Sequence, residues 1–406
     1  MYDAIVVGGG PAGSQTAYRL SKLGYRVAVI EKKPQMAAPV CCTGIVSEEC
    51  VKAYQINPDI IYGHSHSAAI FSPSRIRLSV ERKTPQAAII NRAAFNDWMS
   101  RRARDQGAEY FFGTRVTDII MGQDEITSVT ENSSGSRKFA SKTLVLASGA
   151  DVSLHRKLGL GIPSHLATGA QAEVIINDVE EVEVYTGKAV APGYFGWLVP
   201  TAGNKGLAGL LAKSRPMDHL TNLLEKLQSR GKIGSTVTPA LTGNLPLGPL
   251  ARTYAERILI VGTAAGLVKP TTGGGIYFGL TSADIASEVL DKAFASRDFS
   301  QKNLADYQRR WKAILGRELK TGMQARAIYE RLSDRQIDNI FDIMLETGIV
   351  ESLMSNSDIT FDHHHATVRY LLQQTSLAKL LKGVRVFLQG RTNAKNAFTT
   401  EEKRID

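Results

Sequence analysis

The first thirty-one residues of this 406-residue chain constrain its fold more than any other stretch. Residues 4–7 form a short apolar run typical of a strand, and Gly8–Gly13 follows directly with the pattern G-x-G-x-x-G. Apolar side chains recur at helical spacing over residues 14–23, and Tyr25–Ile30 is a second apolar strand that ends at Glu31. Strand, glycine turn, helix, strand and acid in this register predict a βαβ unit of a nucleotide-binding α/β fold.

Each defined position of that pattern has a separate physical role. Gly8 allows the tight turn, Gly10 lets the backbone approach a pyrophosphate, and Gly13 lets the helix pack closely on the strand. The helix N-terminus presents free N–H groups to the phosphates, and Glu31 is suited to accept hydrogen bonds from an adenosine ribose. The unit therefore predicts binding of an ADP-ribose-type moiety, without distinguishing FAD from NAD.

Length and cysteine content set further bounds. A chain of 406 residues is expected to form two or three domains or subdomains. No apolar run is long enough to span a membrane, and the first strand begins too early for a signal peptide. The three cysteines, Cys41, Cys42 and Cys50, do not indicate a disulfide framework. These features predict a cytoplasmic protein.

The net charge of +10 is concentrated near the C-terminal end. Residues 366–400 contain no acid but hold six basic side chains interleaved with leucine, valine and phenylalanine. This distribution is unlike a nucleic-acid-binding face, so we expect no nucleic-acid partner. A basic amphipathic segment suits an anionic membrane surface, which predicts peripheral attachment to the inner face of a membrane. The alternative is a solvated helix that packs its apolar side on the protein's own core.

Two later strands also end in glycine. The apolar run at residues 144–147 leads to Gly149, and the run at 258–261 leads to Gly262. We expect both strands to join the N-terminal strand in one Rossmann-like sheet, with the strand-rich block 166–244 inserted as an antiparallel β-sheet substrate domain. The nucleotide-binding domain then comprises residues 1–165 and 245–300, with residues 68–90 assignable to either domain. Residues 301–406 are expected to form a helical C-terminal region. Further strands are expected at residues 68–80, 110–116 and 137–140, a proline-glycine connector at 243–249, and a helix that starts at Asn91.

The third of these turns carries the clearest cofactor signal after the N-terminal one. Three glycines, Gly273–Gly275, precede a helix that is expected to begin near Ile276. Backbone N–H groups exposed at such a helix N-terminus suit an anionic or electron-rich edge. Reduced flavin carries negative charge at one edge of its ring system, so the turn favours a flavin.

The combination of these motifs resembles the FAD-dependent geranylgeranyl reductase family (digeranylgeranylglycerophospholipid reductase-like), within the p-hydroxybenzoate hydroxylase-like flavoproteins. Several segments, spanning residues 4 to about 290, carry the resemblance. In chain order they are Gly8–Gly13 with Glu31, Pro39–Cys42, Asn91–Phe95, Ala147–Asp151, Phe195–Pro200 and Gly262–Ile276.

The resemblance implies an FAD-dependent oxidoreductase that reduces C=C double bonds of a geranylgeranyl-type prenyl lipid by hydride transfer from reduced flavin. It implies a set of FAD-contacting residues: Gly8, Gly10, Pro11, Ala12, Gly13, Glu31, Lys32, Cys42, Arg92, Val116, Ala147, Gly149, Gly262, Thr263, Gly274, Gly275 and Ile276. Phe195, Trp197 and Pro270 are assigned to the substrate, since two aromatic side chains alternating on a strand share one face. Cys42 is the candidate catalytic residue, as a proton source near the flavin.

The chain departs from the family pattern at three places. Thr263 stands where the family has an Asp that bonds the flavin ribityl chain, so the affinity or redox potential is expected to differ. Thr43-Gly44-Ile45 replaces Gly-Glu-Gly after the cysteine. Phe195 and Val199 replace Tyr and Phe in the Tyr-x-Trp-x-Phe-Pro motif.

Other functions stay open at this point. Aromatic hydroxylases of this group carry Asp-Gly where this chain has Asp151-Val152, and flavin halogenases carry Trp-x-Trp-x-Ile-Pro where it has Phe195-x-Trp197-x-Val199-Pro200. A membrane-associated electron-transfer flavoprotein would need a second redox centre, which three crowded cysteines cannot ligate. The electron donor of a reductase is open between ferredoxin and a reduced nicotinamide nucleotide.

No metal site is predicted. The run His363–His365 is expected in a loop, where consecutive side chains point in different directions, and no partner ligands lie at zinc spacing from Cys41 and Cys42.

Overall fold

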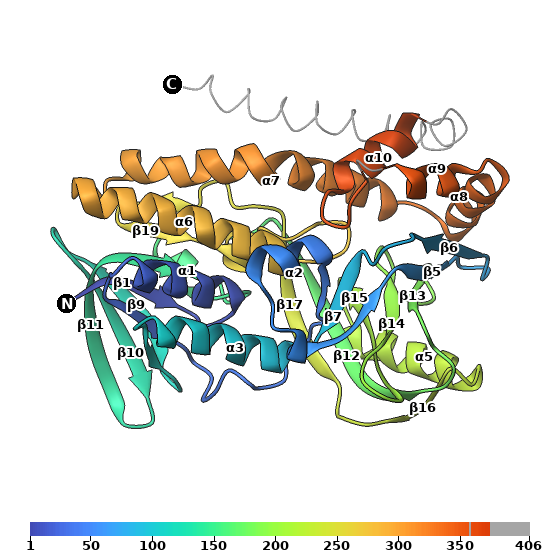
Figure 1. Ribbon diagram of the computed structural model, residues 1–406, viewed down its shortest axis with the longest axis horizontal. Helices are drawn as coiled ribbons and strands as arrows, with labels where there is room; N and C mark the ends of the chain where they lie inside the picture. Colours follow the sequence, from blue (N-terminus) through green and yellow to red (C-terminus); the bar gives the residue numbers. More distant parts are fainter. Residues whose placement is uncertain (357–358, 374–406) are drawn as a thin grey trace, which may run out of the picture.

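The computed structural model describes residues 1–356 and 359–373. Figure 1 shows a parallel sheet with its helices on one side of the molecule, a second sheet on the other, and two long helices along the top of the view. The prediction of a mixed α/β protein with a Rossmann-like domain is confirmed.

The nucleotide-binding sheet brings together all three glycine-ended strands. Its strand order is β18-β19-β11-β1-β2-β8, with β10 and β9 continuing from β11. The strands are β1 (Tyr2–Val7), β2 (Val27–Ile30), β8 (Glu109–Phe111), β9 (Arg115–Met121), β10 (Ile126–Asn132), β11 (Gly135–Leu146), β18 (Tyr254–Ala255) and β19 (Ile258–Ile260). Because β1, β2, β11 and β19 run parallel, their carboxyl ends and their glycine turns lie at the same edge.

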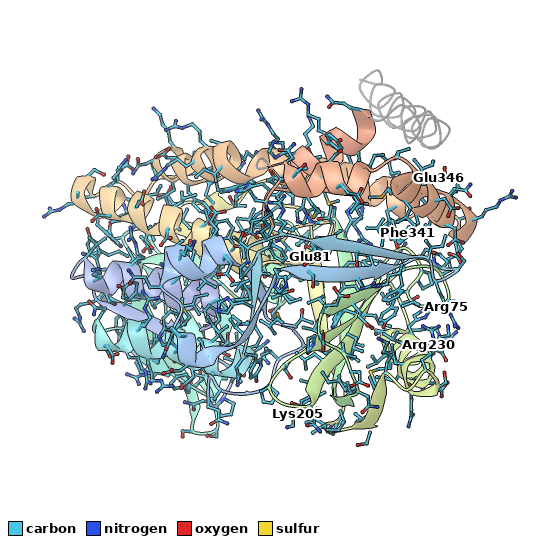
Figure 2. All side chains as sticks on the ribbon, turned by 45° about the vertical axis from the view of Figure 1, so that its right-hand side comes forward. Arg75, Glu81, Lys205, Arg230, Phe341 and Glu346 are labelled. Carbon is cyan, nitrogen blue, oxygen red and sulfur yellow. The ribbon has the colours of Figure 1, made fainter. Side chains whose placement is uncertain are left out.

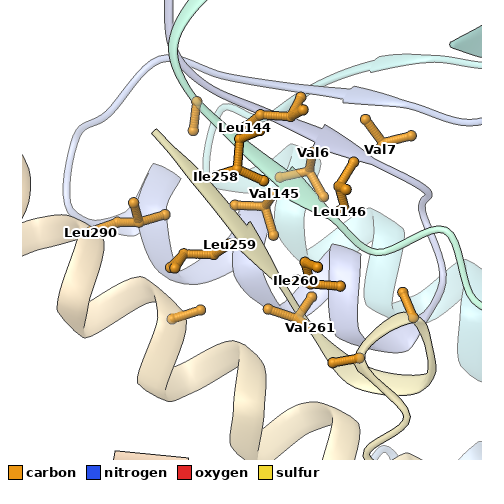
Figure 3. Packing of buried hydrophobic residues seen from close by; sticks show 14 of the residues in the cluster. Val6, Val7, Leu144, Val145, Leu146, Ile258, Leu259, Ile260, Val261 and Leu290 are labelled. Atoms are coloured by element: carbon orange, nitrogen blue, oxygen red, sulfur yellow. The ribbon is translucent and has the colours of Figure 1, made fainter. Parts of the chain in front are cut away.

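Buried aliphatic side chains hold this sheet against its helices. Figure 3 shows Val6, the strand 144–146 and the strand 258–261 packed together, with Leu290 of α6 (Ile276–Ser296) against them. Helices α1 (Pro11–Lys22), α6 and α7 (Gln301–Tyr329) cover this sheet, so its strands read as continuous apolar runs.

Strand β11 differs from the expectation of two short strands at 137–140 and 144–147. It is one twelve-residue strand. Its first part pairs antiparallel with β10, and its second part pairs parallel with β1 and β19. Ser141 and Thr143 are buried in it, and no glycine or proline interrupts residues 136–146. The expected strand at 110–116 is instead divided into β8 and β9, where Gly113 takes a φ of +60°.

The second sheet has the order β16-β12-β15-β14-β13-β5-β6, with β17 also paired to β12. Its strands are β5 (Ser67–Phe71), β6 (Arg77–Glu81), β12 (His165–Ile176), β13 (Val182–Tyr185), β14 (Gly196–Pro200), β15 (Lys205–Ala212), β16 (Ile233–Thr236) and β17 (Leu241–Leu247). Helix α5 (Pro216–Ser229) packs on β15 and β12. The expected single strand at 68–80 is a hairpin, β5–β6, joined to β13.

Residues 243–249 were expected to connect the two domains, but most of them belong to β17. That strand pairs with β12 up to Leu247, so the second sheet extends past residue 244. Pro246 is compatible with this position because β17 pairs only with β12, and an edge strand needs no donor on its open side.

A small third sheet has the strand order β3 (Ile45–Ser47), β7 (Ala87–Ile90) and β4 (Ile61–Ser65). It carries α2 (Glu48–Tyr54) and a 3-10 turn, η1 (Pro58–Ile60), and leads into α3 (Arg92–Asp105). Asn91 caps α3, since its Oδ1 accepts hydrogen bonds from the backbone N–H groups of Ala93 and Ala94 at 3.1 Å each.

Over residues 301–356 and 359–373, the C-terminal region is mainly helical, as expected. After α7 come α8 (Asp334–Glu346), α9 (Ile349–Ser355) and α10 (His364–Gln373). Figure 2 shows Phe341 and Glu346 of α8 beside the hairpin that carries Glu81, and Phe341 shares a buried cluster with Leu78 of that hairpin. Two shorter helices, α4 (Ser153–Lys157) and η2 (Gly262–Ala265), lie at the nucleotide-binding edge.

The histidine run was expected in a loop, but His364 and His365 begin α10. Over residues 1–356 and 359–373, no three His, Cys, Asp or Glu side chains are grouped so that they could hold a metal ion. None of the helices described is both long and apolar enough to cross a membrane. Of the basic segment 366–400, residues 374–400 lie outside the described residues.

Candidate cofactor and substrate site

The N-terminal glycine turn can only be built from glycine at two of its positions. Gly8 has a φ of +103°, and a Cβ added to it would lie 2.5 Å from the carbonyl oxygen of Ala147. A Cβ on Gly13 would lie 1.9 Å from the carbonyl oxygen of Gly8. Gly10, the N-cap of α1, meets nothing within 4 Å on its Cβ side. The turn is therefore packed behind and open in front, as a phosphate-binding turn must be.

Glu31 has a backbone role that the sequence did not reveal. Its Oε2 accepts a hydrogen bond from the N–H of Gly9 at 2.7 Å, and its Oε1 accepts one from the N–H of Lys33 at 2.8 Å. The side chain is buried at 6% exposure. Each carboxylate oxygen can accept a further bond, so Glu31 can brace the glycine turn and still receive a ribose hydroxyl.

A cavity of about 230 Å³ opens at the carboxyl ends of β1, β2 and β11. It brings together residues that lie as far apart in sequence as Gly8 and Leu154. Of the residues predicted to contact FAD, the following line it: Gly8, Gly10, Pro11, Glu31, Lys32, Arg92, Val116, Ala147 and Gly149. Ala12 and Gly13 lie behind the turn instead; the Cβ of Ala12 is 2.8 Å from the position a Cβ would take on Gly262.

Arg92 is the least satisfied polar side chain of this cavity. Its Nε and Nη1 are buried and have no hydrogen-bond partner in the protein, while its guanidinium carbon lies 5.3 Å from the centre of the Phe95 ring. Buried charged donors without an acceptor are costly. An anionic group in the cavity would satisfy them, so the residues present fit the diphosphate of FAD.

The mouth of the cavity carries a charge cluster that the sequence did not single out. Asp151 Oδ2 lies 3.2 Å from Lys32 Nζ and 3.3 Å from Arg115 Nη1. Burial opposes ionisation of Asp151, but hydrogen bonds from Ser153 and Lys32 outweigh it and lower its pKa to about 2. Arg115 was not predicted, because only the tertiary structure brings its strand close to Asp151.

Cys42 lies in a second cavity of about 230 Å³, which shares Val40 and Arg92 with the first. Its far side is formed by the second sheet, where Gln171 of β12 is 4% exposed and its Oε1 has no partner. Cys42, which is predicted to contact the flavin, therefore lines the same cavity as residues of the second sheet. Gln171 was not predicted, since nothing in its local sequence marks it.

The neighbouring Cys41 is a packing residue. Its Sγ lies 3.3 Å from the position a Cβ would take on Gly169, and its Cβ lies 3.2 Å from that on Gly243. Glycines on both paired strands, β12 and β17, thus leave room for it. Burial raises the pKa of the Cys41 thiol to about 12.

The third glycine turn stands beside the first cavity without being among its lining residues. Gly262 and Gly273 have φ values of +61° and +76°, and Gly275 caps α6. Thr263 faces this cap, with its Oγ1 3.5 Å from the position a Cβ would take on Gly275. Gly262, Thr263, Gly274, Gly275 and Ile276 are therefore gathered at one helix N-terminus, and their contact with FAD stays a prediction.

The three residues predicted to contact the substrate do not line one common cavity. Phe195 and Trp197 have ring centres 6.0 Å apart, and both are partly buried against the core of the second sheet, where Gly209 leaves room for the Trp197 ring. Phe195 lines a third cavity of about 340 Å³, and its surroundings are almost entirely apolar. Pro270 lies against α7, with its Cδ 2.8 Å from the position a Cβ would take on Gly322.

The third cavity lies between the second sheet and the C-terminal helices. Val184 and Phe195 come from the sheet side, Ala325 and Tyr329 from α7, and Thr271 from the third glycine turn. The C-terminal contribution was missed, because the sequence alone gives no indication that α7 and α10 lie over β13 and residue 195.

The chain is similar to several known proteins. A family profile described as pyridine nucleotide-disulphide oxidoreductase matches residues 2–188. The chain is 29% identical to digeranylgeranylglycerophospholipid reductase 2 of Methanothermobacter thermautotrophicus over 94% of this chain and 99% of that protein. It is 28% identical to digeranylgeranylglycerophospholipid reductase of Methanocaldococcus jannaschii over 86% of this chain and 91% of that protein.

Among solved structures, a geranylgeranyl bacteriochlorophyll reductase-like protein from Thermoplasma acidophilum has the same fold. The TM-score is 0.84 at 21% identity, covering 95% of this chain and 98% of that one. A flavin-dependent brominase superposes with a TM-score of 0.70 at 15% identity, covering 96% of this chain and 99% of that one. At these sequence identities, the two structures are evidence for the fold and not for the function.

Proposed function

We propose, from the premise that this chain is an FAD-dependent oxidoreductase of the geranylgeranyl reductase-like type, that it saturates C=C double bonds in the prenyl chains of a lipid. The observation that carries the proposal is the apolar third cavity, which reaches from the glycine turn at residue 271 to the C-terminal helices. A hydrocarbon chain gains about 0.8 kcal/mol for each CH₂ removed from water, so a cavity of this kind favours it over a polar substrate.

Bound FAD, once reduced, supplies a hydride to one carbon of the double bond. The protein's part is to hold the two groups together and to exclude water. Phe195 supplies one wall of the apolar site, and Thr271 joins that site to the predicted flavin turn. Arg92 and the N-terminal turn would anchor the opposite end of the cofactor.

The second carbon of the double bond needs a proton, and Cys42 is our candidate source. It lines the second cavity together with Arg92, on the side of the second sheet. A Cys42→Ala variant is expected to keep its FAD but lose most turnover. If prenyl lipid reoxidises the reduced variant at the wild-type rate in a single turnover, Cys42 is not the donor.

The experiment uses the purified FAD-loaded protein, reduced without oxygen and mixed with a geranylgeranyl lipid in detergent. We expect the flavin to reoxidise and the lipid to gain two hydrogens for each double bond by mass spectrometry. A product that requires halide or oxygen would favour a halogenase or a monooxygenase instead. Electron transfer to quinone with no change in the prenyl chain would favour an electron-transfer flavoprotein.

The third cavity is tested by filling it. Ala325→Phe places a ring among its lining residues, whereas Ile314→Phe lies on the same helix at a position that is 53% exposed. We expect lipid reduction to fall at least tenfold in the first variant and to stay unchanged in the second, with equal FAD content. Equal rates in both would place the prenyl chain elsewhere.

The electron donor and the membrane are part of this proposal. Either ferredoxin or a reduced nicotinamide nucleotide would reduce the FAD, and each can be tried separately under anaerobic conditions. A lipid substrate resides in a membrane, which agrees with the basic segment at 366–400 as a means of attachment from the cytoplasmic side.

A further inference from the structure

We infer that Lys269, held by Asp362, is a fixed positive charge behind the flavin turn that raises the reduction potential of the bound FAD. The inference rests on the proposed placement of the flavin at Gly274 and Gly275. It concerns a charge pair that joins two segments 93 residues apart.

Lys269 lies inside the third glycine turn and is almost fully buried. Its backbone N–H donates to the carbonyl oxygen of Gly274 at 2.9 Å, and its carbonyl accepts from the N–H of Gly273 at 2.8 Å. The side chain then folds back under the same glycines. Its Cε lies 2.7 Å, and its Nζ 3.4 Å, from the position a Cβ would take on Gly274. A Cβ at position 274 would force the end of the Lys269 side chain to shift from this path.

The ammonium group is held by a segment from the far end of the described chain. Lys269 Nζ lies 2.7 Å from Asp362 Oδ1, and the two side chains are 7% and 2% exposed. It also donates to the carbonyl oxygen of Phe361 at 3.2 Å and lies 4.5 Å from the centre of the Phe361 ring. A lysine with these partners is fixed in position and screened from salt.

The segment 359–365 is itself attached to the turn and to α7. His364 Nδ1 lies 2.6 Å from Thr271 Oγ1, and its Nε2 lies 2.8 Å from the carbonyl oxygen of Phe361. Burial, with the nearby charge of Lys269, lowers the pKa of His364 to about 4, so its ring is neutral at neutral pH. Nε2 then donates to Phe361, and Nδ1 accepts from Thr271.

A second anchor lies one residue further on. The N–H of His365 donates to Glu318 Oε2 of α7 at 2.9 Å, and its ring also contacts this carboxylate. Asp362 therefore reaches Lys269 from a segment that is attached to the glycine turn and to α7, and the pair cannot move away from the turn without breaking these bonds.

The sign of the effect follows from the order of the charges. The atoms nearest to the Cβ position of Gly274 are those of Lys269 and Thr272, and no atom of Asp362 is among the nearest three. The positive end of the pair thus faces the turn. Reduced flavin carries negative charge that oxidised flavin lacks. A positive charge in a weakly screened site favours the reduced form and raises the potential.

The test is the midpoint potential of the bound FAD, measured without lipid by equilibration with reference dyes. For Lys269→Met we expect the ratio of the affinities for reduced and oxidised FAD to fall about tenfold, which lowers the potential by about 30 mV for a two-electron couple. For Asp362→Asn, which removes only the counter-charge, we expect a shift of opposite sign.

Lys232→Met is the matched control. Lys232 Nζ also lies 2.7 Å from a carboxylate, Glu183 Oε1, in the second sheet. This variant is expected to keep the wild-type potential. Where Lys269→Met leaves Asp362 buried and unpaired and the protein fails to fold, the double variant Lys269→Met/Asp362→Asn removes both charges and is expected to have a potential below those of the wild type and of Asp362→Asn.

Wild-type potentials in the Lys269 and Asp362 variants, with full FAD content, would overturn the inference. That result would leave the reduction of prenyl lipids untouched, because the potential is measured with no substrate present. Conversely, a protein that fails to reduce any prenyl lipid can still show the opposite shifts expected for the two single variants.

Discussion

Replacing Arg92 with methionine should change the stability of the protein and its affinity for FAD in opposite directions. The side chain begins α3 and lines both the first and the second cavity. Its Nε and Nη1 are buried without a partner in the protein. Methionine has a similar length and keeps the contact with Phe95, but it removes the charge and both donors.

The magnitude follows from those two atoms. A hydrogen bond that involves a charged group contributes about 1.5–3 kcal/mol, so two such bonds to a diphosphate contribute about 3 kcal/mol at the low end. The low end applies because Arg92 as a whole is only half-buried. At 1.36 kcal/mol for each factor of ten, FAD should bind roughly a hundredfold more weakly. Without FAD the same two donors are unsatisfied, and their removal should stabilise the protein by about 1 kcal/mol.

The assay is a titration of the FAD-free protein with FAD, followed by flavin fluorescence, together with thermal unfolding of the FAD-free form. Arg92→Lys serves as the control, since it keeps a charge without the planar set of donors, and should bind FAD with intermediate affinity. Wild-type FAD affinity in Arg92→Met, combined with a lower melting temperature of the FAD-free form, would refute the reasoning. Arg92 would then be a packing residue and not a cofactor ligand.

Two further changes test the turn and the C-terminal attachment. Gly13→Ala should abolish FAD binding or folding, because the new methyl group would lie 1.9 Å from the Gly8 carbonyl oxygen. In the control, Gly24→Ala, the methyl group meets nothing within 4 Å, so the protein should lose only the stability that a positive φ costs alanine. Absorbance spectra and circular dichroism measure FAD content and folding of both variants, and a yellow, folded Gly13→Ala protein would contradict the packing argument. The neighbouring Glu318 carboxylate raises the pKa of His363, so its contribution to stability is complete below the ordinary pKa of about 6.5 and is lost as the pH rises through the raised value. The melting temperature of His363→Gln should therefore lie below that of the wild type at about pH 6 and equal it at about pH 9; a difference that does not change with pH would show that this ion pair does not contribute.

Local patterns sufficed for the cofactor-binding unit. The turn at Gly8–Gly13 and the strand ending at Glu31 are set by steric limits on φ and by the alternation of apolar residues within one short stretch. For the same reason the helix starts at Asn91 and Gly275 could be located to within a residue or two. Such features depend on neighbours in sequence, and they would be the same in any fold that used them.

Strand boundaries were less predictable where two sheets meet. The three residues between 140 and 144 read as a connection, yet they are the centre of β11, because strands on both sides supply hydrogen-bond partners for them. Likewise the proline and glycines near Pro246 suggested a connector, and pairing with β12 made that stretch a strand. Local propensity is weak enough for tertiary pairing to override it.

The sequence by itself determined that the chain is a flavoprotein of this fold, since the glycine turns and their spacing admit few other structures. Only the tertiary structure decided that Phe195 lines an apolar cavity that Trp197 does not, and that Lys269 is paired with Asp362. Those outcomes depend on where α7 and the segment 359–365 come to rest against the second sheet and the flavin turn. Contacts between residues far apart in sequence are formed only when the chain folds, so no local pattern records them.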